Sequence, residues 1–79
     1  TYTAQVRYLP ERFQDINLQR LFAQFGSVVS ASVELDSKNR PTGEGKVIFK
    51  DLFCCQTAVK FMDKFYIDGQ RLQVFMDGE

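Results

Sequence analysis

The stretch PTGEGKVIF, from Pro41 to Phe49, decides the fold of this chain. It begins with turn-forming residues and continues as an alternation of side chains with a period of two, which is typical of a β-strand. The residues expected to face a core are Gly45, Val47 and Phe49, and those expected to face the other way are Glu44, Lys46 and Ile48. We expect function on this second face, which carries charge.

The segments on either side of this stretch predict three further strands and two helices. Alternating side chains predict strands over Tyr2–Leu9, Val28–Leu35 and Leu72–Asp77. Apolar residues at helical spacing predict one helix from Asp15 to Gly26 and another over roughly Leu52–Met62. The inward residues are expected to be Ala4, Val6 and Tyr8 in the first strand, Ala31, Val33 and Leu35 in the second, and Cys55, Ala58, Val59 and Met62 in the second helix.

Turn and capping residues mark where these elements end. Pro10 ends the first strand because proline cannot donate to a β-ladder. Asp15 is an N-cap or a first-turn acid, and Gly26 stops the first helix as a C′ glycine would. Residues 36–43 form a polar loop with two basic residues near its tip, and residues 65–69 form a short hairpin-like connection.

The resulting order, βαββαβ, predicts an α+β fold of the split-βαβ, ferredoxin-like type, spanning residues 1–79 as one domain. In this arrangement two helices cover one face of a four-stranded antiparallel sheet and leave the other face open. The residues expected on that open face are Gln5, Arg7, Ser30, Ser32, Glu34, Glu44, Lys46, Ile48, Gln73 and Phe75.

Composition excludes several classes of function. The chain has no His, which removes the commonest general base, and it has no Cys/His spacing suited to zinc. Cys54 and Cys55 are adjacent and predict two reduced thiols in an intracellular protein. No apolar run is long enough to span a bilayer. We therefore expect no enzyme, no cofactor, no metal, no small-molecule substrate and no membrane partner.

Several motifs together resemble the RNA recognition motif (RRM) family over nearly the whole chain. Leu9-Pro10 looks like the end of the first-strand hexamer of that family, and residues 18–26 are similar to its first helix. Residues 67–74 look like its approach to the last strand, and Gly43 to Phe49 resembles its third strand. The string GEGKVIF is also similar to the RRM of the FUS and EWS group, which carries Glu where a ring is usual.

The resemblance implies a sheet on which RNA bases stack, but this chain departs from the usual platform. Thr42 stands at the usual basic position, and Glu44, Lys46 and Gln5 stand at the three usual aromatic positions. Stacking contributes roughly 1–3 kcal/mol per base, so this face is expected to bind RNA weakly. Ten Lys and Arg balance ten Asp and Glu, which also argues against strong non-specific binding.

We interpret the chain as a single-stranded RNA-binding module of a larger RNA-processing protein, with other proteins of that complex as further partners. The residues expected to contact RNA are Gln5, Arg7, Lys38, Arg40, Lys46, Gln73 and Phe75. The alternative is a protein-interaction or self-association module with little RNA affinity. Phe53, Phe61, Phe65 and Tyr66 are expected to pack in the core or at helix edges, and their joint exposure would indicate a protein contact.

Overall fold

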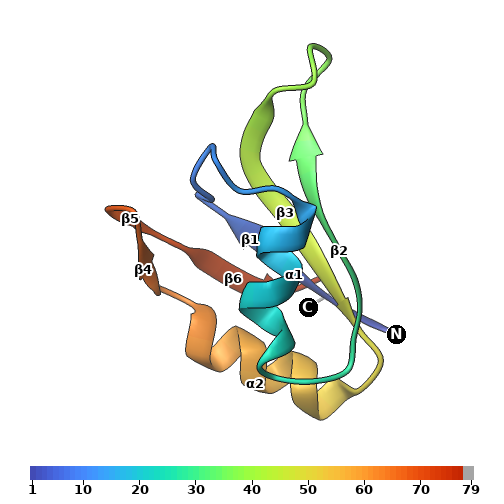
Figure 1. Ribbon diagram of the computed structural model, residues 1–79. Coiled ribbons are helices and arrows are strands. Elements are labelled where there is room, and N and C mark those ends of the chain that lie inside the picture. Colours follow the sequence, from blue (N-terminus) through green and yellow to red (C-terminus); the bar gives the residue numbers. More distant parts are fainter. Residues whose placement is uncertain (78–79) are drawn as a thin grey trace.

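The computed structural model describes residues 1–77 and contains one four-stranded sheet, two helices and a small hairpin (Figure 1). The elements are β1 (Tyr2–Arg7), α1 (Asp15–Ala23), β2 (Val28–Leu35), β3 (Pro41–Phe49), α2 (Leu52–Met62), β4 (Tyr66–Ile67), β5 (Gln70–Arg71) and β6 (Gln73–Met76). The main sheet has the order β2-β3-β1-β6, and each neighbouring pair is antiparallel. The predicted fold class is therefore confirmed.

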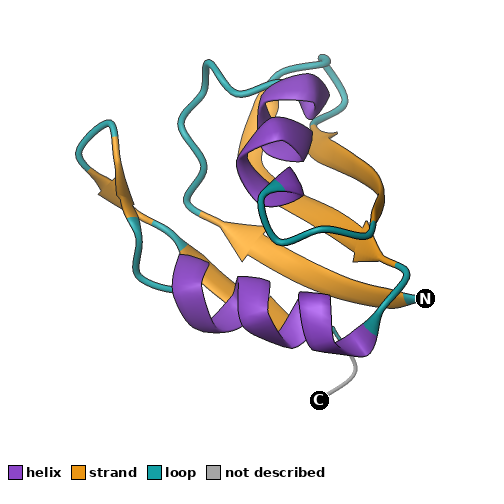
Figure 2. Ribbon diagram, turned by 60° about the horizontal axis from the view of Figure 1, so that its bottom comes forward, coloured by secondary structure: helices purple, strands orange, loops and turns teal. Residues whose placement is uncertain are grey.

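Both helices lie on the same side of the main sheet (Figures 1 and 2). Their inner faces meet the inward residues of the central strands in one apolar cluster. The buried members of this cluster are Ala4, Val6, Leu9, Phe13, Leu18, Phe22, Val47, Phe49, Cys55, Ala58, Met62, Leu72 and Val74. The opposite side of the sheet bears the outward residues of the same strands, so the helices leave that side available for binding.

Gly45 shows how tightly α1 and the sheet are packed. A Cβ atom at this position would lie 2.9 Å from the Ser32 carbonyl oxygen and 3.0 Å from methyl carbons of Leu18 and Leu9. The centre of β3 therefore admits no side chain on its helix side, and the absence of one lets α1 approach the sheet closely.

Strand β1 is shorter than predicted, and Tyr8 is not a core residue. β1 ends at Arg7, and Tyr8 takes a left-handed backbone conformation with φ of 67°. This turn breaks the alternation, so Leu9 is buried in place of Tyr8, which is 58% exposed. Leu9 N–H then donates to the Gly43 carbonyl oxygen at 2.8 Å, which fixes the exit of β1 against β3.

Strand β2 is irregular at both ends. Its pairing with β3 shifts register between Val28 and Ser30 and again between Val33 and Leu35. A register shift of this kind changes the face on which following residues lie. Leu35, expected to face inward with Ala31 and Val33, is consequently half exposed.

Local hydrogen bonds and capping residues mark where helix α1 begins and ends. Gln14 caps α1, and its N–H donates to Asn17 Oδ1 at 3.0 Å. Asp15 is thus the first-turn acid, the second of the two predicted roles, and its carboxylate also accepts from Val33 N–H at 2.8 Å. The C-cap is Gln24, so Gly26, predicted to be the C′ residue, lies one position beyond the observed C′ site and has a φ of 81°.

The second half of the chain matches the prediction more closely. Helix α2 spans Leu52–Met62 as expected, and Asp51 caps it by accepting from Phe53 N–H at 2.7 Å. The predicted connection at residues 65–69 is part of a separate β4–β5 hairpin, so the last strand begins later than predicted. None of the helices in residues 1–77 has the length and apolar character to cross a bilayer.

Candidate nucleic-acid interface

The strand register aligns the outward residues in two rows across the open face. In the first row, Lys46 pairs with Ser32 on one side and with Gln5 on the other, and Gln5 pairs with Phe75. In the second row, Arg7 pairs with both Glu44 and Gln73. Paired residues of an antiparallel sheet point to the same face. The structure therefore brings together Gln5, Arg7, Lys46, Gln73 and Phe75, five of the seven predicted site residues.

The first row borders a polar hollow in the sheet surface. Gln5, Ser32, Glu34, Gly45 and Lys46 line a space of about 420 Å³. An amide, a hydroxyl, a carboxylate and an ammonium group meet here, and together they can donate to and accept from base edges or hold a phosphate. The predicted polar residues Gln5 and Lys46 thus lie where a nucleotide crossing the sheet would meet both.

Arg7 connects the charged and aromatic residues of this face. Its Nε lies 3.5 Å from Glu44 Oε1, and its guanidinium carbon lies 5.2 Å from the centroid of the Phe75 ring. The guanidinium is therefore both ion-paired and placed for a cation–π contact. Both charged side chains remain about half exposed, so the ion pair adds little stability and can rearrange when a ligand binds.

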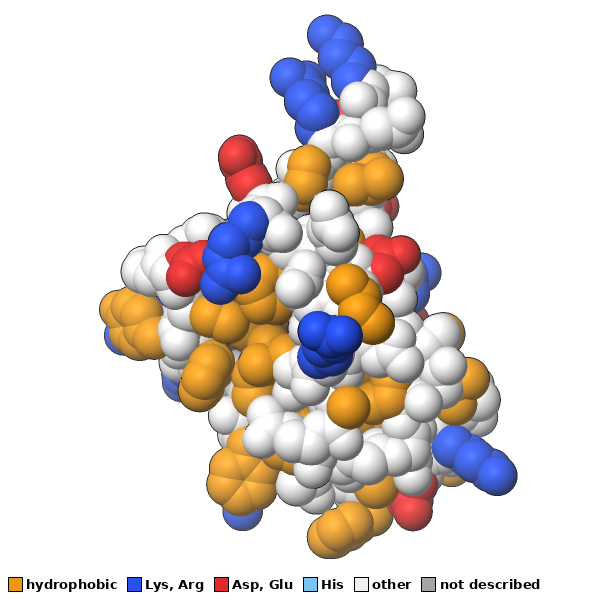
Figure 3. All heavy atoms as spheres, in the orientation of Figure 1, with side chains coloured by type: hydrophobic (Ala, Val, Ile, Leu, Met, Phe, Trp, Pro, Cys, Tyr) orange, Lys and Arg blue, Asp and Glu red, His pale blue; other side chains and the backbone are white. Residues whose placement is uncertain are grey.

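The remaining predicted residues, Lys38 and Arg40, lie on the β2–β3 loop away from the two rows. This loop projects beyond the sheet in Figure 1, and Lys and Arg side chains extend from its tip in Figure 3. Asp36 organises the loop by accepting from the backbone N–H groups of Arg40 at 2.9 Å and Lys38 at 2.8 Å. These hydrogen bonds, that of Arg40 first, lower the pKa of Asp36 below its ordinary value.

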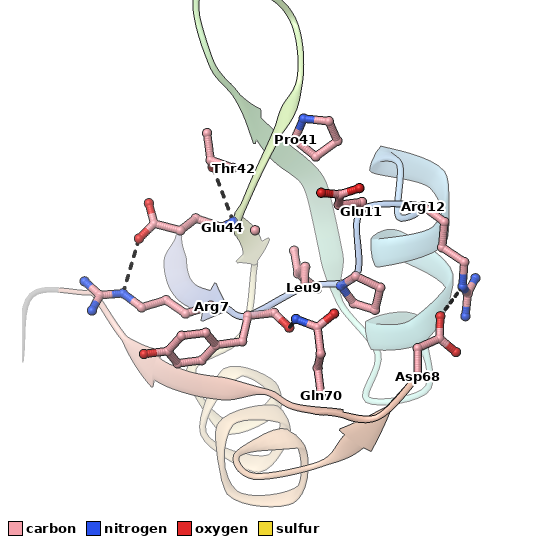
Figure 4. A pocket seen from close by; sticks show the side chains of 12 residues that line it. Arg7, Leu9, Glu11, Arg12, Pro41, Thr42, Glu44, Asp68 and Gln70 are labelled. Carbon is pink, nitrogen blue, oxygen red and sulfur yellow. Dashed lines mark hydrogen bonds and ion pairs between the residues drawn. The ribbon is translucent and has the colours of Figure 1, made fainter.

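A second and larger hollow adjoins the second row at the end of β1 (Figure 4). Its volume is about 730 Å³, and it lies between the β1–α1 segment, the start of β3 and the β4–β5 hairpin. Its lining residues are Arg7, Tyr8, Leu9, Pro10, Glu11, Arg12, Pro41, Thr42, Gly43, Glu44, Asp68 and Gln70. Arg7 and Glu44 belong to both this hollow and the open face, so the two surfaces are continuous.

Two contacts from the β4–β5 hairpin hold this hollow in shape. Arg12 donates to Asp68 in an ion pair, and this hydrogen bond lowers the pKa of the Asp68 carboxyl. Gln70 Nε2 donates to the Tyr8 carbonyl oxygen at 3.3 Å, so the hairpin supports the residue with the left-handed backbone. Sequence reasoning missed Tyr8, Gln70 and Asp68 as site residues because alternation assigned Tyr8 to the core and the hairpin to a mere connection.

The four aromatic residues expected to pack in the core or at helix edges are instead exposed. Their exposed fractions are 73% for Phe53, 62% for Phe61, 43% for Phe65 and 61% for Tyr66. The ring of Phe61 stacks on Phe25 with centroids 6.3 Å apart, and both residues line a mostly apolar hollow together with Phe65. We call Phe25, Phe61 and Phe65 the helix-side aromatic cluster.

The open face carries charged groups, amides and an aromatic ring, and the cysteines lie elsewhere. Cys55 is buried, as expected, and Cys54 is partly buried. Residues 1–77 contain no group of three or more His, Cys, Asp or Glu that could hold a metal ion. A sheet layer with helices on one side, and with cations, amides and an aromatic ring on the other, is the architecture of a nucleic-acid-binding module.

Comparison with known proteins gives the family. The sequence profile described as the RNA recognition motif matches residues 5–73, and the chain belongs to this family. The fold matches a crystal structure of the RNA-binding protein PG1 with a TM-score of 0.93 and 28% identity, over 100% of this chain and 96% of that one. The finer resemblance of β3 to the FUS and EWS group stays a prediction.

Two further solved structures show the same arrangement. The second RRM domain of the yeast poly(U)-binding protein matches with a TM-score of 0.89 and 25% identity, over 100% of this chain and 96% of that one. RNA recognition domains 1 and 2 of the Drosophila melanogaster Sex-lethal protein match with a TM-score of 0.87 and 27% identity, over 94% of this chain and 48% of that one.

Proposed function

We propose that this domain binds single-stranded RNA across its open face, as part of a larger RNA-processing protein in a reducing, intracellular compartment. The role is binding without catalysis. The residues proposed to contact RNA on the face are Gln5, Arg7, Lys46, Gln73 and Phe75, with Lys38 and Arg40 reaching from the β2–β3 loop.

One observation carries this proposal: Lys46, Gln5 and Phe75 form a continuous row across β3, β1 and β6. A phosphate-binding cation, a hydrogen-bonding amide and a stacking ring are the three kinds of contact that single-stranded RNA requires. Relatives of the same fold include a poly(U)-binding protein and the Sex-lethal protein, of which a complex with RNA is among the solved structures. Both support assigning RNA as the ligand.

The affinity of the isolated domain is expected to be modest. Gln5, Glu44 and Lys46 occupy positions at which the family usually has stacking rings, and the carboxylate of Glu44 repels phosphate. Segments flanking the domain in the larger protein would then supply much of the affinity. We expect dissociation constants in the micromolar range, nearer to non-specific than to specific nucleic-acid binding.

The direct test is an NMR titration of this chain with a single-stranded RNA heptamer at low and at physiological salt. We expect amide shifts at Gln5, Lys46 and Phe75, with the helix side unchanged. The Lys46→Ala variant should bind more weakly. The control variant Arg20→Ala removes the same charge from α1 and should bind as the parent does. Absence of shifts at high micromolar RNA, with and without the flanking segments, would contradict the proposal.

The helix-side aromatic cluster favours a second candidate function, a protein contact. Exposed rings grouped around an apolar hollow are typical of protein-interaction sites, and Figure 3 shows hydrophobic side chains at the surface on the side where α1 and α2 lie. Self-association through this cluster predicts a sedimentation coefficient that rises with protein concentration and stops rising in Phe61→Ser. Sedimentation as a monomer at all concentrations would remove self-association as a function of this face.

A further inference from the structure

We infer that the hollow at the end of β1 is a guanine subsite, in which Glu44 reads the base and Tyr8 stacks on it. This inference rests on the proposed RNA-binding function and extends it by naming one base and the residues that select it. The hollow, of about 730 Å³, falls within the usual size range of small-molecule sites.

The hollow adjoins the second row of the open face, so a single-stranded RNA that crosses the sheet reaches it next. Arg7 and Glu44 stand in the second row of the open face and also form one wall of the hollow (Figure 4). A nucleotide that follows one bound at the second row therefore meets the hollow directly. No rearrangement of the sheet is needed to connect the two surfaces.

The charges of the hollow favour a base over a phosphate. Its walls carry three carboxylates, Glu11, Glu44 and Asp68, against two guanidinium groups, Arg7 and Arg12. Both guanidinium groups are already paired with carboxylates of the same wall. A phosphate entering here would meet an excess of negative charge, whereas a neutral base with N–H donors would be attracted to the carboxylates.

The chemistry of Glu44 selects guanine among the bases. An ionised carboxylate offers two acceptor oxygens and no donor. The Watson–Crick edge of guanine presents two adjacent donors, N1–H and the N2 amino group. The other three bases place an acceptor beside each donor on that edge. Glu44 is about half exposed at the rim, and its Oε1 lies 3.5 Å from Arg7 Nε in a surface ion pair that can rearrange, so a rotation of the side chain can present both oxygens to a base.

Tyr8 supplies the stacking surface that the usual positions lack. It lines the hollow, is 58% exposed and is held in a left-handed conformation, with φ of 67°, that is uncommon for an aromatic residue. Such conformations are unfavourable for residues that carry a side chain, and they persist where the surroundings enforce them, often at functional sites. The hydrogen bond from Gln70 to the Tyr8 carbonyl oxygen and the burial of Leu9 provide that enforcement.

The experiment compares three RNA heptamers by fluorescence anisotropy: all-uridine, one with a single central guanosine, and one with inosine in its place. We expect the guanosine heptamer to bind about tenfold more tightly than the uridine one, the scale of a bidentate base contact. Inosine lacks the N2 amino group and should lose most of this gain.

Three variants test which residues produce the preference for guanosine over uridine. Glu44→Gln replaces one acceptor with a donor and should reduce the guanosine-to-uridine ratio to within about twofold, even if the freed Arg7 raises affinity for every RNA. Asp77→Asn removes the same charge at the opposite end of β1, next to Thr3, and should keep the ratio. Tyr8→Asn tolerates the left-handed conformation but lacks the ring, so it should weaken binding of the guanosine heptamer.

The outcomes separate the two proposals. RNA binding without a guanosine preference, or a preference that survives Glu44→Gln, overturns the guanine subsite and leaves the proposed RNA-binding function standing. A preference lost equally in Asp77→Asn assigns it to overall charge and also overturns the subsite. No binding of any heptamer overturns both.

Discussion

Phe75 lies beside Gln5 on the open face and has the guanidinium of Arg7 over its ring. In the unbound protein the ring is therefore partly covered, and a base must displace Arg7 or stack in its place. Because guanidinium planes also stack on bases, Arg7 can move with the base and remain in contact with it.

Replacing Phe75 with leucine tests this ring while keeping apolar bulk against the sheet. Stacking contributes about 1–3 kcal/mol per base, and leucine retains part of that contact. We therefore expect the dissociation constant for single-stranded RNA to rise about fivefold to tenfold in Phe75→Leu, measured by fluorescence titration. Phe53→Leu changes a ring that is 73% exposed on α2 and should have no effect. Equal affinities of Phe75→Leu and the parent would remove Phe75 from the interface.

Gly45 is a second position at which a single residue affects the stability of the whole domain. Its missing side chain leaves room for Leu9, Leu18 and the Ser32 carbonyl group. Gly45→Ala should lower the free energy of unfolding by roughly 1–3 kcal/mol, the usual cost of overpacking. Urea unfolding measures this change. Ser30→Ala, at an exposed position in β2, should stay within about 0.5 kcal/mol of the parent.

At the scale of elements, the β2–β3 loop is ordered by one carboxylate. The pKa of Asp36 lies below its ordinary value of 3.8 because the N–H groups of Arg40 and Lys38 donate to the ionised form. A lowered pKa in the folded state means that ionised Asp36 favours the ordered loop above pH 3.8. This contribution is lost as the pH falls through the lower, folded-state pKa.

The corresponding measurement follows the amide resonances of Lys38 and Arg40 from pH 5 to pH 2. We expect both to shift together with a midpoint below 3.8 in the parent and to show no such transition in Asp36→Asn. A midpoint at or above the ordinary value would mean that Asp36 does not organise the loop. In that case the placement of Lys38 and Arg40 for RNA binding would lose its support.

Most of this element-level organisation could be predicted from the sequence. Alternation in β1 and β3 correctly placed Gln5, Arg7 and Lys46 on one face, because a strand with regular register preserves its period of two. The errors arise where register or backbone conformation changes. Tyr8 leaves the pattern through a left-handed φ, and Leu35 leaves it through a register shift, and neither event is visible in the order of polar and apolar residues.

The exposure of the aromatic rings was mispredicted for a different reason. Phe53 and Phe61 in α2 and Phe65 just after it are apolar, and hydrophobicity alone favours a buried position. The helix nevertheless buries a face made of the smaller residues Cys55 and Ala58 together with Met62. These side chains pack against the sheet, and the large rings remain exposed to solvent. The helical period correctly predicts this inner face, but whether a neighbouring element covers the rings beside it depends on three-dimensional packing.

At the scale of the whole molecule, equal numbers of acidic and basic residues limit how strongly salt can affect RNA binding. Four proposed cations, Arg7, Lys38, Arg40 and Lys46, can neutralise at most four phosphates. Counterion release from a single strand contributes a slope of about −0.7 per phosphate. We expect the logarithm of the binding constant to fall with the logarithm of salt concentration with a slope no steeper than about −3.

Titrations at four salt concentrations measure this slope. Lys46→Ala should make the slope shallower by about 0.7, whereas Arg20→Ala, in α1, should leave it unchanged. A slope much steeper than −3 would require cations outside the proposed interface and would indicate a different RNA path over the surface.

The irregular pairing of β2 has one more consequence, which concerns the tendency of the protein to aggregate. β2 is an outer strand of the main sheet, and a straight outer strand with free amides invites cross-β association between copies. The two register shifts, between Val28 and Ser30 and between Val33 and Leu35, bend this border, so a neighbouring chain cannot extend the ladder along its full length. A chain without net charge to keep its copies apart thus gains resistance to fibril growth from the shape of its own edge.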